Sequence, residues 1–356
     1  MGITSISVMA KTPSTLKRAP LSLKLICLLA VYLGSGTLQP LAVDELRYHN
    51  ALGPVYLLLP TLASTLGMAA VGLLVPRDDI RSVLARLRRS GGVASPTTGW
   101  SLRRVVLSGA VIDLAAGVLL TVGLEIVGGS VFSVLYASTT AWTALLAKVF
   151  LKRDIGAVRG LGVASVTAGL VLNAIGVAES VELQNRAQLL GGSALVIAGS
   201  ALHSAMFVYT ERFIRYERVM PALAWSAALG ASEAVVLLLW ILLSRLVHGP
   251  FVGHSTSYRA ALAACVLILI NAMHSAAFFR IIDQIGAVAS ALMKGVQTCL
   301  VFCVSAVLFC AVDSAQCFST LKAVSCVLVV GGVVVYGTVR APAAKLPLTG
   351  AADETV

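Results

Sequence analysis

Ten apolar stretches, each long enough to cross a lipid bilayer, are the feature that most constrains this chain. The hydrocarbon core of a bilayer is about 30 Å thick, so a spanning helix needs roughly 20 mostly apolar residues. Of the 356 residues, 58% are hydrophobic and only 12% are charged, against roughly 25% charged residues in soluble domains. The sequence therefore predicts an all-α membrane protein and excludes a soluble one. We place the spans at residues 21–41, 51–75, 104–126, 129–151, 157–178, 188–210, 221–246, 259–281, 286–311 and 319–339.

Positive charges set the expected orientation, because cytosolic loops of membrane proteins are enriched in Lys and Arg. With a cytosolic N-terminus, 20 of the 27 Lys and Arg residues fall in cytosolic segments and 5 on the opposite side. We therefore expect the tails 1–20 and 340–356 and the Arg-rich loop 76–103 to be cytosolic. The net charge of +11 comes without interleaved aromatic residues or a recognition motif, so nucleic acid is not an expected partner.

A weak internal repeat suggests two halves of five helices each. Gly129-Ser-Val131 aligns with Gly286-Ala-Val288, and the same offset pairs Ser133 with Ser290 and Leu135 with Leu292. Five helices per half would invert the second half relative to the first, which is a common transporter plan with a ligand site at the interface of the repeats. The predicted halves are 21–178 and 188–339.

Lys294 is the ionisable residue that most needs an explanation. It stands eight or nine residues into the span 286–311, where a cation costs at least ~2.5–3.5 kcal/mol. Ser290, Gln297 and Thr298 share its helical face at i−4, i+3 and i+4. Lys294 therefore either faces a water-filled cavity, where it attracts phosphate as a point charge, or forms a structural ion pair with a membrane carboxylate.

Four further ionisable residues stand in apolar spans. Asp113 and Glu233 lie near mid-span and could pair with Lys294, accept a proton for coupling, or face a polar pocket between helices. His203 and His274 are either proton carriers or ligand contacts, or neutral residues hydrogen-bonded between helices.

Hydroxyl and amide side chains complete the candidate binding residues. Ser133, Tyr136, Thr140 and Thr143 fall on one face of the fourth span because they are spaced by three or four residues, and Asn271 lies in the eighth. They could line a cavity, or the small ones could let helices pack closely.

The sequence carries no motif of an enzyme or of a cofactor site: HExxH, GxSxG and a phosphate-binding P-loop are absent. No Cys or His spacing indicates a metal site. Most of the seven cysteines lie in apolar spans, where cysteine behaves as a small hydrophobic residue. Cys310 and Cys317 flank a short loop and could pair if that loop faces an oxidising lumen.

The expected partners are the bilayer and a small anionic solute. Small-residue faces such as Gly331-Gly332 in the last span permit helix pairing, so a homodimer is also an expectation.

Two segments resemble the nucleotide-sugar transporters of the drug/metabolite transporter superfamily. Residues 292–337, which include LMKGVQTCLVFCVSAVLFC and LKAVSCVLVVGGVVVYG, resemble the last two helices, and residues 135–154, LYASTTAWTALLAKVFLKRD, resemble the fourth. The resemblance is strongest to the branch that carries CMP-sialic acid and UDP-galactose.

The resemblance implies ten helices in two inverted halves in a Golgi or endoplasmic reticulum membrane. It implies exchange of a nucleotide sugar for a nucleoside monophosphate. In that family a lysine of the ninth helix contacts phosphate and a tyrosine of the fourth lies near the ligand; Lys294 and Tyr136 occupy these positions.

The chain departs from the family at two places. Thr139 stands where the branch has a second lysine, and the seventh span reads LAWSAALGASEAVV instead of carrying the Phe-Tyr-Asn-Asn motif of GDP-mannose carriers. Two alternatives therefore stay open. One is a related, proton-coupled carrier of another small organic anion or metabolite; the other is a membrane subunit or receptor that transports nothing.

Overall fold

The computed structural model describes residues 22–48, 58–88, 93–136, 138–178, 186–248, 258–311 and 317–338. These residues form a bundle of helices with no strand, apart from a single β-bridge between Val93 and Ser101. The two predicted tails lie outside the described residues. The helices are α1 (Leu23–Tyr48), α2 (Leu59–Ala70) with the 3₁₀ turn η2 (Val71–Leu74), α3 (Arg77–Arg88), α4 (Leu102–Tyr136), α5 (Thr139–Phe150), α6 (Ala157–Ala178), α7 (Arg186–Thr210) with the π-helical segment η4 (Glu211–Tyr216), α8 (Ala222–His248), α9 (Tyr258–Ile285), α10 (Ala287–Phe309) and α11 (Thr320–Thr338).

Many of these helices are long and apolar enough to cross a membrane. In the described part of the chain seven qualify, or eight if α2 and α3, which are bent by 113° at their junction, count as one span. A shorter apolar helix covers Ala157–Leu172. Leucines on the outer face of α8, such as Leu239 and Leu246, are 61% and 76% exposed, as expected for side chains that face lipid. The architecture is that of a multi-pass helical membrane protein.

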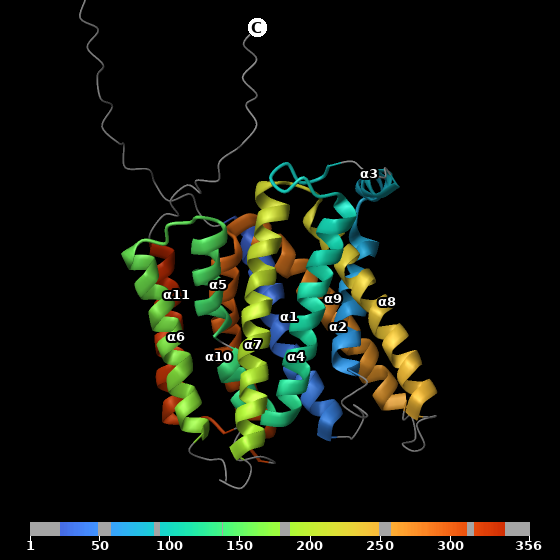
Figure 1. Cartoon of the computed structure of the whole chain (residues 1–356). Coiled ribbons are helices and arrows are strands. Elements are labelled where there is room, and N and C mark those ends of the chain that lie inside the picture. Colours follow the sequence, from blue (N-terminus) through green and yellow to red (C-terminus); the bar gives the residue numbers. More distant parts are fainter. Residues whose placement is uncertain are drawn as a thin grey trace, which may run out of the picture.

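The structure moves one helix boundary and adds one helix. The sequence placed a break at 127–128, but α4 continues to Tyr136 and α5 begins at Thr139. Tyr136 therefore lies at the end of α4, on a different helix from Thr140 and Thr143. The loop 76–103 contains α3, which carries four arginines and stands at one end of the bundle (Figure 1).

The helices pack in pairs that cross the midpoint of the chain. Helix α1 packs against α9 and α10, α2 against α8 and α9, α4 against α7 and α8, and α6 against α11. Glycines permit close approach in these pairs: a Cβ on Gly162 of α6, for example, would lie 2.7 Å from the carbonyl oxygen of Gly332 on α11. Gly332 therefore packs against α6 of the same chain, whereas no described atom lies within 4 Å of a Cβ built on Gly331.

A buried ion network ties three segments together at one end of the bundle. Glu211 of η4 is fully buried, and its Oε1 lies 3.3 Å from a nitrogen of Arg153 and 3.5 Å from one of Arg215. Its Oε2 accepts a 2.8 Å hydrogen bond from the backbone N–H of Ala287, the first residue of α10. Gly286 adopts a φ of 89° just before this N–H, a conformation that glycine reaches without strain. The network therefore joins the α5–α6 connection, η4 and the start of α10.

A disulfide joins Cys310 and Cys317, whose Cα atoms are 4.5 Å apart. It links the end of α10 to the segment before α11. Since α10 begins at the Glu211 network and runs away from it, the disulfide lies at the opposite end of the bundle.

Candidate solute cavity

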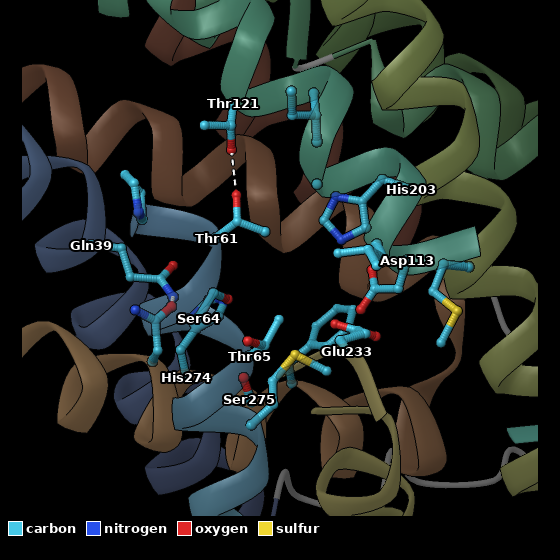
Figure 2. A pocket seen from close by; sticks show the side chains of 18 of the residues that line it. Gln39, Thr61, Ser64, Thr65, Asp113, Thr121, His203, Glu233, His274 and Ser275 are labelled. Carbon is cyan, nitrogen blue, oxygen red and sulfur yellow. Dashed lines mark hydrogen bonds between the residues drawn. The ribbon is translucent and has the colours of Figure 1, made fainter. Parts of the chain in front are cut away.

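A cavity of about 290 Å³ lies among seven helices. Figure 2 shows its polar side chains converging from α1, α2, α4, α7, α8 and α9, and α10 contributes Lys294. The lining residues are Gln39, Pro60, Thr61, Ser64, Thr65, Met68, Asp113, Leu114, Gly117, Leu120, Thr121, Phe132, Tyr136, His203, Met206, Phe207, Glu233, Asn271, His274, Ser275, Phe278, Phe279 and Lys294. Thirteen of these 23 residues have polar or ionisable side chains, so the lining is more polar than the mostly apolar wall that is usual for small-molecule sites.

Lys294 reaches this cavity from the third turn of α10. It is half-buried, and it lies seven residues after Ala287, which is about 10 Å along the helix axis. Its Nζ stands 5.5 Å from the centroid of the Tyr136 ring, within the range of a cation–π contact. In the described part of the chain no ion pair within 4.0 Å includes Lys294. Lys294 therefore lines the cavity, and none of the described carboxylates lies at ion-pair distance from its ammonium.

Tyr136 and His203 form one polar wall. The Tyr136 hydroxyl and His203 Nδ1 are 2.8 Å apart, so the end of α4 is fixed against α7. The His203 ring in turn meets Phe207 edge-on at 4.8 Å. Both predicted residues line the cavity, and their mutual hydrogen bond sets the position of the Tyr136 ring beside Lys294.

His274 and Asn271 stand on successive turns of α9 and bond to α1. His274 stacks on Tyr32 at 4.6 Å, and its Nδ1 lies 3.2 Å from the carbonyl oxygen of Tyr32. The Asn271 side-chain oxygen accepts a 2.5 Å hydrogen bond from Gln39, while its amide donates to the carbonyl of Leu267. Both predicted residues therefore line the cavity and also lock α9 to α1.

Asp113 and Glu233 form an acidic pair in the wall. Figure 2 shows their carboxyl groups pointing toward one another from α4 and α8. Glu233 is 2% exposed, and its Oε1 has no hydrogen-bond partner among the residues that the structure describes. The predicted ion pair between either carboxylate and Lys294 is not formed.

Several predicted residues are not among those that line the cavity. Their hydroxyl or amide groups bond to backbone carbonyls: Ser290 to Gly286, Thr298 to Lys294, Thr140 to Ala291 and Gln297 to Gly36. A residue on the same helical face as Lys294 does not necessarily line the cavity, because that face of α10 also packs against α1 and α5. The side chain of Ser133 lies outside the described residues.

The first two helices also contribute polar residues to the cavity, which we did not predict from the sequence. Gln39 of α1 and Thr61, Ser64 and Thr65 of α2 line the cavity, and Thr61 bonds to Thr121 of α4 at 2.7 Å. The segment PTLAST carries three hydroxyl residues spaced three and four apart, which places them on one face of a helix. The same pattern is equally typical of a helix face that packs closely against a neighbour, so the sequence alone does not indicate a cavity. Among the described residues, no group of three or more His, Cys, Asp or Glu side chains could hold a metal ion.

Comparisons with known proteins identify a fold and no family. A scan against known protein families finds no match, and a search of curated proteins finds none either. Chains of solved structures do match. One of them, described only as the crystal structure of a protein, superposes with a TM-score of 0.58 at 17% identity, covering 88% of this chain and 96% of its own. At that identity the match supports the fold alone. Fold and cavity together define a multi-pass helical membrane protein with a polar cavity inside its bundle.

Proposed function

We propose that the protein is a membrane carrier for a small organic anion and that it works by alternating access. The observation that carries this proposal is Lys294, an ammonium that faces a polar cavity inside the bundle with no carboxylate within 4.0 Å in the described residues. A cation in a membrane span is costly and marks a substrate path by default. A bound anion would give this ammonium the close-range partner that no described carboxylate supplies within 4.0 Å.

The helix packing supports two inverted halves, α1–α6 without α3 and α7–α11. If α1 corresponds to α7, α2 to α8, α4 to α9, α5 to α10 and α6 to α11, the contact of α4 with α7 maps onto that of α9 with α1. The contact of α2 with α9 likewise maps onto that of α8 with α4, and α6 with α11 maps onto itself. Such pseudo-symmetry lets the two halves rock around a central site. It is also the arrangement expected if the chain has the predicted ten spans in two halves of five.

The solute class is an anion carrying phosphate or a similar group. Nucleotide-sugar exchange for a nucleoside monophosphate is the version that the family resemblance implies. The cavity has a volume of about 290 Å³, close to the lower limit of the usual ~300–1,000 Å³ for ligand sites. Thr139, which stands where the resembling branch has a second lysine, is buried, and its hydroxyl bonds to the backbone of Tyr136. It therefore adds no second positive charge for a diphosphate. Both observations favour a monophosphate-sized anion in this conformation.

The orientation is part of the proposal. Disulfides persist in oxidising compartments, so the Cys310–Cys317 bridge favours a lumenal or external position for that end of the bundle. The opposite end, with the Glu211 network and the arginines of α3, would be cytosolic, as the distribution of Lys and Arg also predicts. A Golgi or endoplasmic reticulum membrane is the location that the resemblance implies.

Flux measurements in proteoliposomes test the proposal. Vesicles loaded with radiolabelled uridine or cytidine monophosphate should release label when unlabelled nucleotide sugars or monophosphates are added outside. Release should exceed that from protein-free vesicles, and Lys294→Ala should abolish it. Lys148→Ala, which removes an exposed lysine at the end of α5, is the matched control and should leave the flux unchanged. Equal flux through wild-type and Lys294→Ala protein would remove Lys294 from the site, and the absence of any anion flux would overturn the proposal.

A further inference from the structure

The charges inside the cavity are unevenly placed. Its ionisable side chains are Lys294 on α10, His203 on α7, His274 on α9, Tyr136 on α4, and the pair Asp113 and Glu233. The histidines and the tyrosine are occupied by hydrogen bonds to neighbours. Lys294 and the acidic pair therefore dominate the charge balance of the cavity.

Two carboxyl groups that face each other in a site of low dielectric do not both ionise, because like charges repel there and neither is solvated. Glu233 is 2% exposed with a free Oε1, and no cation lies within 4.0 Å of Glu233 or Asp113 in the described part of the chain. A pair that shares one proton has a net charge of −1. This balances the single positive charge of Lys294 while the cavity is empty.

An incoming anion upsets that balance. Once it binds at Lys294, the negative charge of the pair is left without compensation a short way off in the same cavity. Leaving a buried charge unpaired is costly, and a second proton on the pair removes it. The proton comes from bulk water and bonds to a carboxylate oxygen, and no covalent bond of the solute changes.

We propose that Asp113 and Glu233 form a proton-binding pair which takes up a proton each time an anion binds at Lys294. This inference rests on the proposed function, since it assigns the coupling ion of the same site. It has a consequence for the transport cycle: the empty cavity is electrically balanced, so the empty carrier can reorient and net anion uptake can follow a proton gradient.

The test is the pH dependence of anion binding to the purified full-length protein. Uridine monophosphate is the probe, titrated between pH 7.5 and 8.5, where the phosphate is almost fully dianionic because its second pKa is about 6. Uptake of one proton per anion predicts that the affinity rises roughly tenfold for each unit of pH decrease. A pH indicator in weak buffer should report proton uptake when the nucleotide is added.

A double isosteric variant assigns the effect, because in either single variant the remaining carboxyl can still take up the proton. Asp113→Asn/Glu233→Gln should bind the nucleotide with a flattened pH dependence, whereas Asp78→Asn, which alters an exposed carboxyl on α3, should retain the full slope. If the double variant keeps the full pH dependence of binding, the proton is taken up by His203, His274 or Lys294 and the assignment to the acidic pair is wrong. If a variant does not fold, the wild-type result still decides, because binding without proton uptake refutes the coupling and leaves the carrier proposal standing. Absence of binding by uridine monophosphate, cytidine monophosphate and inorganic phosphate would refute both.

Discussion

At the scale of residues, Lys294 was visible in the sequence because a charge in an apolar helix is rare and expensive. The other residues of the cavity wall were harder to recognise in the sequence. Gln39 and Thr61 line the cavity, yet polar residues of this kind also serve helix packing, and only the packing of α1 and α2 decides which face they turn inward. Thr140 shows the reverse error: it is buried against the backbone of α10.

Tyr136 offers a test of how the wall around Lys294 works. Tyr136→Phe removes the 2.8 Å hydrogen bond to His203 and keeps the ring beside the ammonium. A hydrogen bond is worth about 1 kcal/mol net, so anion affinity should fall roughly fivefold. Tyr136→Leu should weaken binding further, since the cation–π contact is lost as well. Titration calorimetry checks both variants, and equal affinities for Tyr136→Phe and Tyr136→Leu would show that the ring does not matter.

At the scale of elements, glycine spacing decides how closely α6 and α11 approach. Gly332→Val should destabilise the fold by about 1–3 kcal/mol, the usual cost of overpacking, because its Cβ would stand 2.6 Å from the Gly162 carbonyl oxygen. The adjacent Gly331→Val is the control, since nothing lies within 4 Å of a Cβ there. Thermal unfolding in detergent should separate the two. A larger loss for Gly331→Val would point instead to a partner chain packed on this face.

The Glu211 network is a second device at this scale. Glu211→Gln leaves Arg153, which is 6% exposed, without its counter-ion, and breaking a buried pair from one side costs about 3–5 kcal/mol. We expect a large fall in thermal stability. Because the network joins η4 to the start of α10, the packing of these two segments should also become weaker. Asp78→Asn breaks the exposed pair with Arg81 and should change stability by at most about 1 kcal/mol. Similar losses in the two variants would contradict this view of the network.

Helix boundaries are harder to predict from the sequence than the presence of helices, for a physical reason. Hydropathy reports length and apolarity but not bends, so the continuation of α4 to Tyr136 was missed. Helix α3 was missed because its four arginines and two aspartates hide the apolar residues Ile80, Val83 and Leu84, which recur at helical spacing.

At the scale of the whole molecule, the disulfide and the arginines of α3 predict opposite environments for the two ends of the bundle. Asp78→Cys should react with a membrane-impermeant maleimide only from the cytosolic side, and Phe318→Cys, which replaces a 48% exposed side chain next to the disulfide, only from the other. Labelling of intact and selectively permeabilised cells measures this. Both positions reacting from one side would overturn the orientation.

The membrane class and the helical architecture followed from composition and hydropathy, because the bilayer leaves few ways to satisfy a buried backbone. The meeting of seven helices at one cavity could not be derived in the same way, since it depends on contacts between residues far apart in the chain. Gln39 with Asn271 and Tyr136 with His203 are examples.

A cryo-electron microscopy map of the protein with uridine monophosphate bound tests the role of Lys294 most directly. We expect phosphate density in the cavity within hydrogen-bond distance of Lys294 Nζ, with Asp113 and Glu233 still facing one another. Phosphate density away from Lys294, or an ammonium clasped by either carboxylate in the bound state, would contradict it.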